Sequence, residues 1–248
     1  MPTTDVPALA SDIRSRLETI RTRIDAACAR AGRSPSDVRL IAVTKTFPLE
    51  VVRAGIEAGL TDFGENRVRE LEEKGEAIPG EINGGDVRWH LIGPLQKNKI
   101  NKTLGVADAF HALDSERMAE HIDKRAARAE RVLPCFVQVN VSGEASKSGV
   151  EPEETHAFLD RLAQFEHLQI VGLMTLAEPV ETDGELETVV RLQFQRLRRL
   201  AETYDSVGNG IVLDRLSMGM SGDFEVAVEE GATDVRIGSA LFGPRPEA

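Results

Sequence analysis

Short apolar segments alternate with helical patterns along the chain, and this alternation restricts the possible folds more than any other feature. The first segment, residues 38–45, is rich in β-branched residues, as expected for a strand buried on both faces of a parallel sheet. A regular alternation of strands and helices indicates an α/β protein with a parallel sheet. Seven further segments have the same character: residues 62–64, 87–92, 107–113, 134–141, 169–174, 213–218 and 234–237.

Helical periodicity occupies the intervals between these segments. An amphipathic pattern from Leu9 to Cys28 ends at Gly32, before the first strand, and another helical pattern opens at Pro48 and ends at Gly59. No Pro- or Ser-rich linker divides the chain. We therefore predict that residues 1–248 form a single (β/α)8 TIM barrel with an extra N-terminal helix, in preference to two domains or an open doubly wound sheet. The remaining predicted helices are residues 66–77, 96–104, 115–130, 152–165, 184–203 and 223–230.

The composition argues against several classes of protein. With 41 acidic and 30 basic residues the formal net charge is −11, which disfavours binding to nucleic acid or to an anionic membrane surface. No segment approaches the roughly 18–20 apolar residues of a membrane span, and the N-terminus does not resemble a secretory signal. Two distant cysteines, Cys28 and Cys135, lie in apolar surroundings, as is typical of core residues in a reducing compartment. We expect a cytoplasmic protein.

Lys45 stands at the end of the first predicted strand, in the string Ile41-Ala-Val-Thr-Lys45. Functional residues of such barrels project from the C-terminal ends of the strands. Partial burial lowers the pKa of an amine, and a neutral amine forms a Schiff base with a sugar carbonyl or with the aldehyde of pyridoxal phosphate. The spacing alone equally fits a lysine whose ammonium group reaches solvent from a strand end.

A candidate phosphate site follows the last strand. Gly238 and Ser239 begin a short helical turn there, and N–H groups at the start of a helix bind phosphate. Barrels often place such a site after strands seven and eight, where Ser217 offers a second hydroxyl, although an ordinary turn fits the same residues. Barrel closure brings the first and last strands together. Lys45 and this turn therefore predict a site for an aldehyde that carries a phosphate.

The motifs of the chain resemble those of the YggS/PROSC family of pyridoxal phosphate-binding proteins, also called pyridoxal phosphate homeostasis proteins. The resemblance extends over nearly all of residues 6–244 and implies a fold like the barrel domain of alanine racemase. Besides residues 41–45 it rests on Phe63-Gly-Glu-Asn66, Trp89-His-Leu-Ile-Gly-Pro-Leu-Gln-Lys-Asn98, Val139-Asn140, Ser146-Lys-Ser-Gly149, Gly172-Leu-Met-Thr175, Leu216-Ser-Met-Gly-Met-Ser221 and Val235-Arg-Ile-Gly-Ser239.

The resemblance also implies a role for individual residues. Lys45 would form the aldimine with pyridoxal 5′-phosphate (PLP), and Asn66 would lie beside the ring, although Asn66 alone could be a helix N-cap. Arg236, expected at the barrel mouth, would face the ring nitrogen or the phosphate and would weaken the ring as an electron sink. We expect Arg236→Glu to reduce cofactor retention and to leave the fold largely intact. The phosphate end would be bound or lined by Ser217, Met218, Gly219, Gly238 and Ser239.

Three functions share the lysine and the phosphate site. A carrier or regulator of PLP needs nothing more, whereas an amino-acid racemase needs a second acid/base group. Related racemases take a tyrosine from a second domain of a partner subunit, while the one tyrosine here, Tyr204, lies near the end of a predicted outer helix. Schiff-base aldolases usually place the lysine near strand six, where residues 172–175 have none. We expect a monomeric, non-catalytic PLP carrier that serves apo-enzymes.

Two other polar residues have simpler interpretations. His90 is predicted to be a hydrogen-bonded residue of the barrel interior, and no second histidine is spaced to form a metal pair with it. We therefore predict no metal site. Lys147, in the loop after the fifth predicted strand, is expected to meet solvent, with binding of a second PLP as the alternative.

Overall fold

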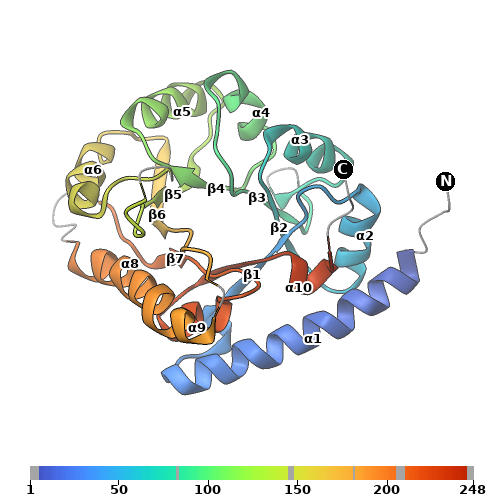
Figure 1. Ribbon diagram of the computed structural model, residues 1–248. Coiled ribbons are helices and arrows are strands. Elements are labelled where there is room, and N and C mark those ends of the chain that lie inside the picture. Colours follow the sequence, from blue (N-terminus) through green and yellow to red (C-terminus); the bar gives the residue numbers. More distant parts are fainter. Residues whose placement is uncertain (1–5, 82–83, 145–147, 181, 205–209, 245–248) are drawn as a thin grey trace.

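Eight parallel strands close into a barrel in chain order, which confirms the predicted fold (Figure 1). The computed structural model describes residues 6–81, 84–144, 148–180, 182–204 and 210–244. Closure occurs where β1 (Arg39–Val43) pairs with β8 (Asp234–Ile237). The strands between them are β2 (Asp62–Glu65), β3 (Arg88–Leu91), β4 (Ala109–Leu113), β5 (Leu133–Gln138), β6 (Leu168–Met174) and β7 (Arg215–Ser217).

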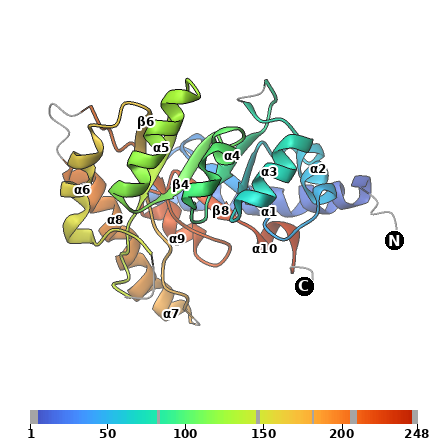
Figure 2. The same cartoon turned by 90° about the horizontal axis from the view of Figure 1, so that it is seen from above.

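The predicted extra helix is α1 (Val6–Ala31), which precedes β1 and lies outside the ring of barrel helices. It packs against α2 (Leu49–Glu57), α9 (Phe224–Glu229) and α10 (Ser239–Phe242), and a turned view of the molecule again places it beside α10 (Figure 2). One stripe of its side chains, spaced by three or four residues, carries this packing: Ile13, Leu17, Ile20, Ile24 and Cys28.

The other helices cover the outside of the barrel between successive strands. The predicted helix 184–203 is a continuous run of three elements, α7 (Asp183–Glu185), a π-helical turn (Leu186–Val190) and α8 (Arg191–Thr203). In the described part of the chain, short 3-10 turns lie at Pro35–Asp37, Lys97–Lys99 and Pro152–Glu154. The remaining helices are α3 (Val68–Ala77), α4 (Ile100–Leu104), α5 (Glu116–Arg128) and α6 (Thr155–Leu162). Among the described residues, no helix is both long enough and apolar enough to cross a membrane.

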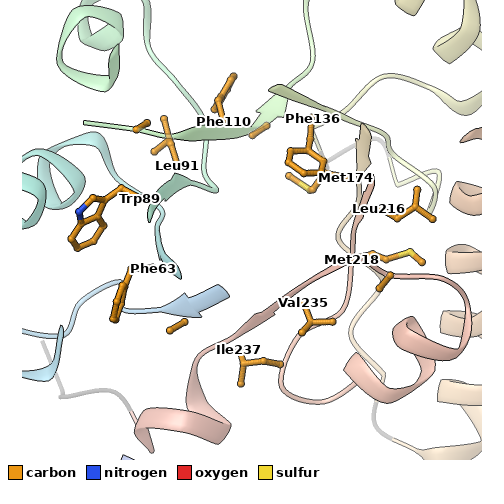
Figure 3. Close-up of a cluster of buried hydrophobic side chains, with 14 of the residues drawn as sticks. Phe63, Trp89, Leu91, Phe110, Phe136, Met174, Leu216, Met218, Val235 and Ile237 are labelled. Carbon is orange, nitrogen blue, oxygen red and sulfur yellow. The ribbon is translucent and has the colours of Figure 1, made fainter. Parts of the chain in front are cut away.

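Strands β3 and β8 carry apolar side chains on one face and a polar side chain on the other. Successive side chains of a strand point to opposite faces, so Trp89 and Leu91 lie opposite His90, and Val235 and Ile237 lie opposite Arg236. The apolar set around the ring of strands is drawn in Figure 3. Both cysteines are fully buried and free, as predicted. The polar side chains of the strands, among them His90 and Arg236, form a buried hydrogen-bonded cluster in the barrel interior.

Several strands end earlier than the sequence predicts. Strand β1 ends at Val43, and residues 44–47 form a turn in which the Phe47 N–H donates to the Thr44 carbonyl at 3.0 Å. Thr46 occupies the left-handed region of backbone conformation, with φ at 69°. The chain has to leave the barrel here to begin α2, and this change of direction ends the strand. Lys45 therefore belongs to a turn at the barrel mouth.

Candidate functional site

The strand register brings three of the predicted site residues together at the C-terminal mouth of the barrel. Val43 of β1 pairs with Gly64 of β2, so Lys45 and Asn66 each follow a paired residue by two positions. On the other side of β1, Ala42 pairs with Ile237, the residue before Gly238. Because parallel strands end at the same side of the sheet, these three residues occupy neighbouring strand ends. Lys45 itself is half-buried.

Asn66 lies between β2 and α3 and is not the cap of that helix. The N-cap position belongs to Arg67, which makes no side-chain capping hydrogen bond. The backbone of Gly93, after β3, passes so close that a Cβ atom there would lie 2.2 Å from the Asn66 carbonyl oxygen. Gly93 therefore lets the segment after β3 pack against Asn66. Gly93 belongs to the motif of residues 89–98, but only its packing against Asn66 shows why a glycine is needed there.

Backbone N–H groups converge at the start of α10. The N–H groups of Gly238 and Ala240 both donate to the hydroxyl of Ser221, at 3.3 and 3.2 Å. Ser239 is exposed beside them. Two amide donors and two hydroxyls form a suitable donor set for an anion such as phosphate. Ser221, which belongs to a motif of the sequence, is absent from the predicted site because its contact with residues after β8 depends on tertiary structure.

The loop after β7 is joined to β8 through its backbone. The Arg236 N–H donates to the Gly219 carbonyl at 2.9 Å. Gly219 has a φ of 94°, and a Cβ atom on it would lie 2.6 Å from the Ala227 Cβ. Met218 is fully buried in the hydrophobic core, so its backbone is the part that can line the mouth.

Arg236 is buried just below the mouth of the barrel, where its guanidinium reaches the C-terminal ends of β6 and β7. It pairs with Ile41 in the middle of β8 and is only 4% exposed. Its guanidinium donates to the Ser217 hydroxyl at 2.7 Å and to the Thr175 carbonyl at 2.8 Å. Burial lowers the pKa of Arg236 to about 10, against the opposing effect of nearby aspartates, so the group remains charged at neutral pH.

A chain of buried hydrogen bonds continues from Ser217 across the barrel interior. The Ser217 hydroxyl lies 2.9 Å from Nδ1 of His111, and Nε2 of His111 lies 3.0 Å from Nδ1 of His90. Nε2 of His90 lies 3.1 Å from Oδ1 of Asp62, which also binds Arg88 through both carboxylate oxygens. Burial alone would raise the pKa of Asp62, but hydrogen bonds from His90 and Arg88 hold that pKa well below its usual range.

The ionised Asp62 gives this chain a direction. A carboxylate only accepts hydrogen bonds, so His90 donates to it from Nε2. Nδ1 of His90 lies against Nε2 of His111, and Nδ1 of His111 lies against the Ser217 hydroxyl, which accepts from Arg236. Arg236 is thereby joined to Asp62 through buried hydrogen-bonded side chains.

His90 lies in the barrel interior, which confirms the prediction. Its partner His111 was not predicted from the sequence. The two residues are 21 positions apart, on neighbouring strands, and only the strand register makes them adjacent. They are joined by a hydrogen bond. In the described ranges no group of three or more His, Cys, Asp or Glu side chains is arranged to hold a metal ion. Lys147 and Ser146 lie outside the described residues.

A cavity of about 300 Å³ opens at the same end of the barrel, beyond the ends of β3 to β6. This volume is at the lower end of the range for small-molecule sites. The cavity begins at Asn66 and so adjoins the strand end that carries Lys45. Its lining combines apolar and amide side chains, among them Phe110, Met118, Gln138, Asn140 and Leu176.

The closed barrel of eight parallel strands is of the alanine racemase type. Residues 15–246 match the family model described as "Alanine racemase, N-terminal domain". The alanine racemase of Clostridium difficile is similar in structure, with a TM-score of 0.69 at 17% identity, over 96% of this chain and 58% of that chain. At this identity the likeness concerns the fold alone.

Relatives of higher identity define the family more narrowly. The chain is 41% identical over 230 residues to the pyridoxal phosphate homeostasis protein of Aquifex aeolicus, covering 93% of this chain and 97% of that protein. Identity to its namesake from Pseudomonas aeruginosa is 40%, with coverage of 95% and 96%. PipY of Synechococcus elongatus, solved with PLP bound, has a TM-score of 0.78 at 34% identity, covering 93% of this chain and 100% of PipY. The chain belongs to the family of pyridoxal phosphate homeostasis proteins.

Proposed function

We propose that this protein binds PLP covalently through Lys45 and takes part in intracellular PLP homeostasis, without catalysis of its own. One observation carries the proposal. The register of β1 between β2 and β8 places Lys45 between Asn66 and Gly238, so an amine and a set of anion donors share one end of the barrel. The names of the relatives and the PLP bound to PipY agree with this reading.

The donors at the mouth fit the chemical groups of PLP. Bound PLP supplies an aldehyde for an amine and a ring that withdraws electrons. Lys45 is the amine. The amides of Gly238 and Ala240 with the hydroxyls of Ser221 and Ser239 suit the phosphate, and the backbone of Met218 and Gly219 lies beside them. The close packing at Gly93 and Gly219 leaves no room for added side chains.

Arg236 and Asn66 would contact the ring. Arg236 offers a fixed positive charge because Ser217 and Thr175 orient its guanidinium. A cation at the ring nitrogen disfavours protonation of that nitrogen, which weakens the ring as an electron sink. Ser217 acts through Arg236, since its hydroxyl is already bound to Arg236 and His111. These residues would hold the cofactor and would not activate it.

Covalent attachment is tested directly by reductive trapping. We expect purified protein incubated with PLP to gain a visible absorption band, and borohydride reduction to fix the label on Lys45 in a peptide mass spectrum. Lys45→Ala should lose both signals. Lys102→Ala, which removes an exposed lysine paired with Glu72, should keep them. A wild-type protein that shows neither the band nor the label would refute the proposal.

The position of Tyr204 supports a non-catalytic role. Its hydroxyl donates to Asp160 Oδ1 at 3.0 Å, and its ring packs against His156 of α6. This tyrosine therefore lies between helices on the outside of the barrel and is not the opposing acid/base group that a racemase needs. No exchange of the α-hydrogen of alanine with solvent deuterium is expected at ordinary enzyme rates. Measurable exchange that is lost in Lys45→Ala would favour a racemase instead.

We further propose that the chain acts as a single-domain monomer in the cytoplasm and passes PLP to apo-enzymes. A closed barrel leaves no open sheet edge for another chain to pair with. The large exposed apolar side chains among the described residues are few: Val132, Leu176, Leu192, Val212 and Met220. Sedimentation tests the monomer. Mixing the loaded protein with a PLP-dependent apo-enzyme, and comparing its reactivation with that by free PLP, tests the transfer.

A further inference from the structure

A buried cluster of charged residues lies directly behind the turn that carries Lys45. Lys74 of α3 has a side chain only 8% exposed, and its ammonium donates to Glu65 Oε1 at 2.6 Å and to the Thr44 carbonyl at 2.8 Å. Glu65, the last residue of β2, is fully buried. A buried ammonium is stable only when its hydrogen bonds are satisfied. Lys74 is thus held against the backbone of the residue before Lys45.

The cluster binds the chain on both sides of Lys45. On one side, the Thr44 hydroxyl donates to Glu65 Oε1 at 2.6 Å. On the other side, the Thr46 N–H donates to Glu70 Oε2 at 2.6 Å, and that oxygen lies 3.7 Å from the Lys74 ammonium. Lys74, Glu65 and Glu70 form what we call the brace. It fixes the backbone next to Lys45 from the side of α3.

The conformation of the turn shows why a brace is needed. Thr46 is β-branched and has a φ of 69°, which such residues seldom adopt unless their surroundings enforce it. The N–H of Thr46 is held by the Glu70 carboxylate. Without this contact the turn could relax toward a commoner conformation, and the Lys45 side chain would start from a different position.

Glu65 depends on Lys74 for its charge balance. Its Oε1 atom accepts from Lys74 and Thr44, whereas its buried Oε2 atom has no hydrogen-bond partner among the described residues. Burial raises the pKa of Glu65, and the nearby ammonium opposes this rise. Removal of Lys74 would leave a buried carboxylate with one hydroxyl donor, so the residues of the brace support one another.

We propose that the brace is a positioning device for Lys45 that sets how fast and how completely this lysine becomes attached to a phosphorylated aldehyde. The inference rests on the proposed function. The brace touches Thr44 and Thr46 and acts on Lys45 through their backbone. In the covalent step the Lys45 nitrogen would bond to the aldehyde carbon, and the carbonyl oxygen would leave as water with the two amine hydrogens. This step requires an accurately placed amine, so the effect of the brace should fall there and not on retention of the phosphate group by the residues after β7 and β8.

Lys74→Met tests this division, because methionine keeps the length of the side chain and removes its charge. We expect its rate of covalent PLP attachment to fall roughly ten- to a hundred-fold, the range that a small misplacement of a reacting group produces. Affinity for pyridoxine 5′-phosphate, which lacks the aldehyde, should stay within about twofold of wild type. Lys102→Met serves as the matched control, since Lys102 of α4 forms an exposed ion pair with Glu72 of α3, the helix that carries Lys74.

Glu70→Ala provides a second variant in case Lys74→Met does not fold. Glu70 is half-buried at the edge of the brace, and its removal frees the Thr46 N–H and ends the longer 3.7 Å contact with Lys74. We therefore expect slower attachment with unchanged retention of pyridoxine 5′-phosphate. A wild-type attachment rate in the folded variants would overturn the inference, as would an equal loss of attachment and of pyridoxine 5′-phosphate binding. Failure of the wild type itself to attach PLP would refute the proposed function instead.

Discussion

Arg236 occupies a position where charge and burial act against each other. The guanidinium is 4% exposed and satisfied by Ser217 and Thr175, so the site accommodates a cation but not an anion. We expect Arg236→Glu to lower the free energy of unfolding by about 3–5 kcal/mol, because it buries an unpaired carboxylate close to Asp234. Urea denaturation without PLP measures this loss. This expected loss differs from the prediction made from the sequence, which was that Arg236→Glu leaves the fold largely intact.

Arg236→Gln is the companion variant that separates charge from packing. It removes the cation without adding a carboxylate, and we expect it to cost about 1–3 kcal/mol through lost hydrogen bonds. Equal unfolding free energies for wild type and both variants would contradict the buried position of Arg236.

Lys45 could be identified from the sequence because it ends an apolar segment. The depth of Arg236 could not, since it depends on where β8 pairs with β1.

The loop between β7 and α9 owes its shape to one glycine. Gly219 has a φ of 94° and no space for a Cβ atom, which would approach the Ala227 Cβ to 2.6 Å. We expect Gly219→Ala to destabilise the protein by about 1–3 kcal/mol, through backbone strain and overpacking. Thermal unfolding measures the effect. Gly219→Ala should also weaken binding of pyridoxine 5′-phosphate, because the same loop carries Ser221.

Gly222 supplies the control for this loop. It lies three residues further along, with open space around its Cα atom and no strained φ, so Gly222→Ala should change stability little. Two variants of equal stability would show that Gly219 is not the residue that shapes the loop. The sequence places both glycines in one predicted turn. Only the packing of α9 residues Phe224 and Ala227 against Gly219 distinguishes them.

Across the whole molecule, the buried chain from Arg236 to Asp62 makes stability depend on pH. Burial, and then the nearby His90 and Arg236, lower the pKa of His111 well below the ordinary value of 6.5. An unfolded histidine takes up a proton as pH falls through about 6.5, whereas folded His111 does not. The unfolded state then binds more protons, so stability decreases as pH falls below this value.

His111→Phe should remove this contribution. Phenylalanine retains the stacking that His111 makes with Phe136, whose ring centroid is 4.2 Å away, but it cannot titrate. We expect the unfolding free energy of wild type to fall between pH 7 and 5 more steeply than that of the variant, by up to about 1.4 kcal/mol per pH unit. Denaturation series at several pH values give both slopes. Identical slopes would show that the pKa of His111 is the same in the folded and the unfolded protein.

The sequence by itself determined the barrel, the extra helix, the buried cysteines and the placement of Lys45 and Gly238 at strand ends. Each of these follows from local periodicity or from the order of strands in a closed barrel. Only the tertiary structure decided the contact of His90 with His111, the convergence of two amides on Ser221, and the brace behind Lys45. These contacts join residues on different elements, and they depend on strand register and on how helices pack against strands.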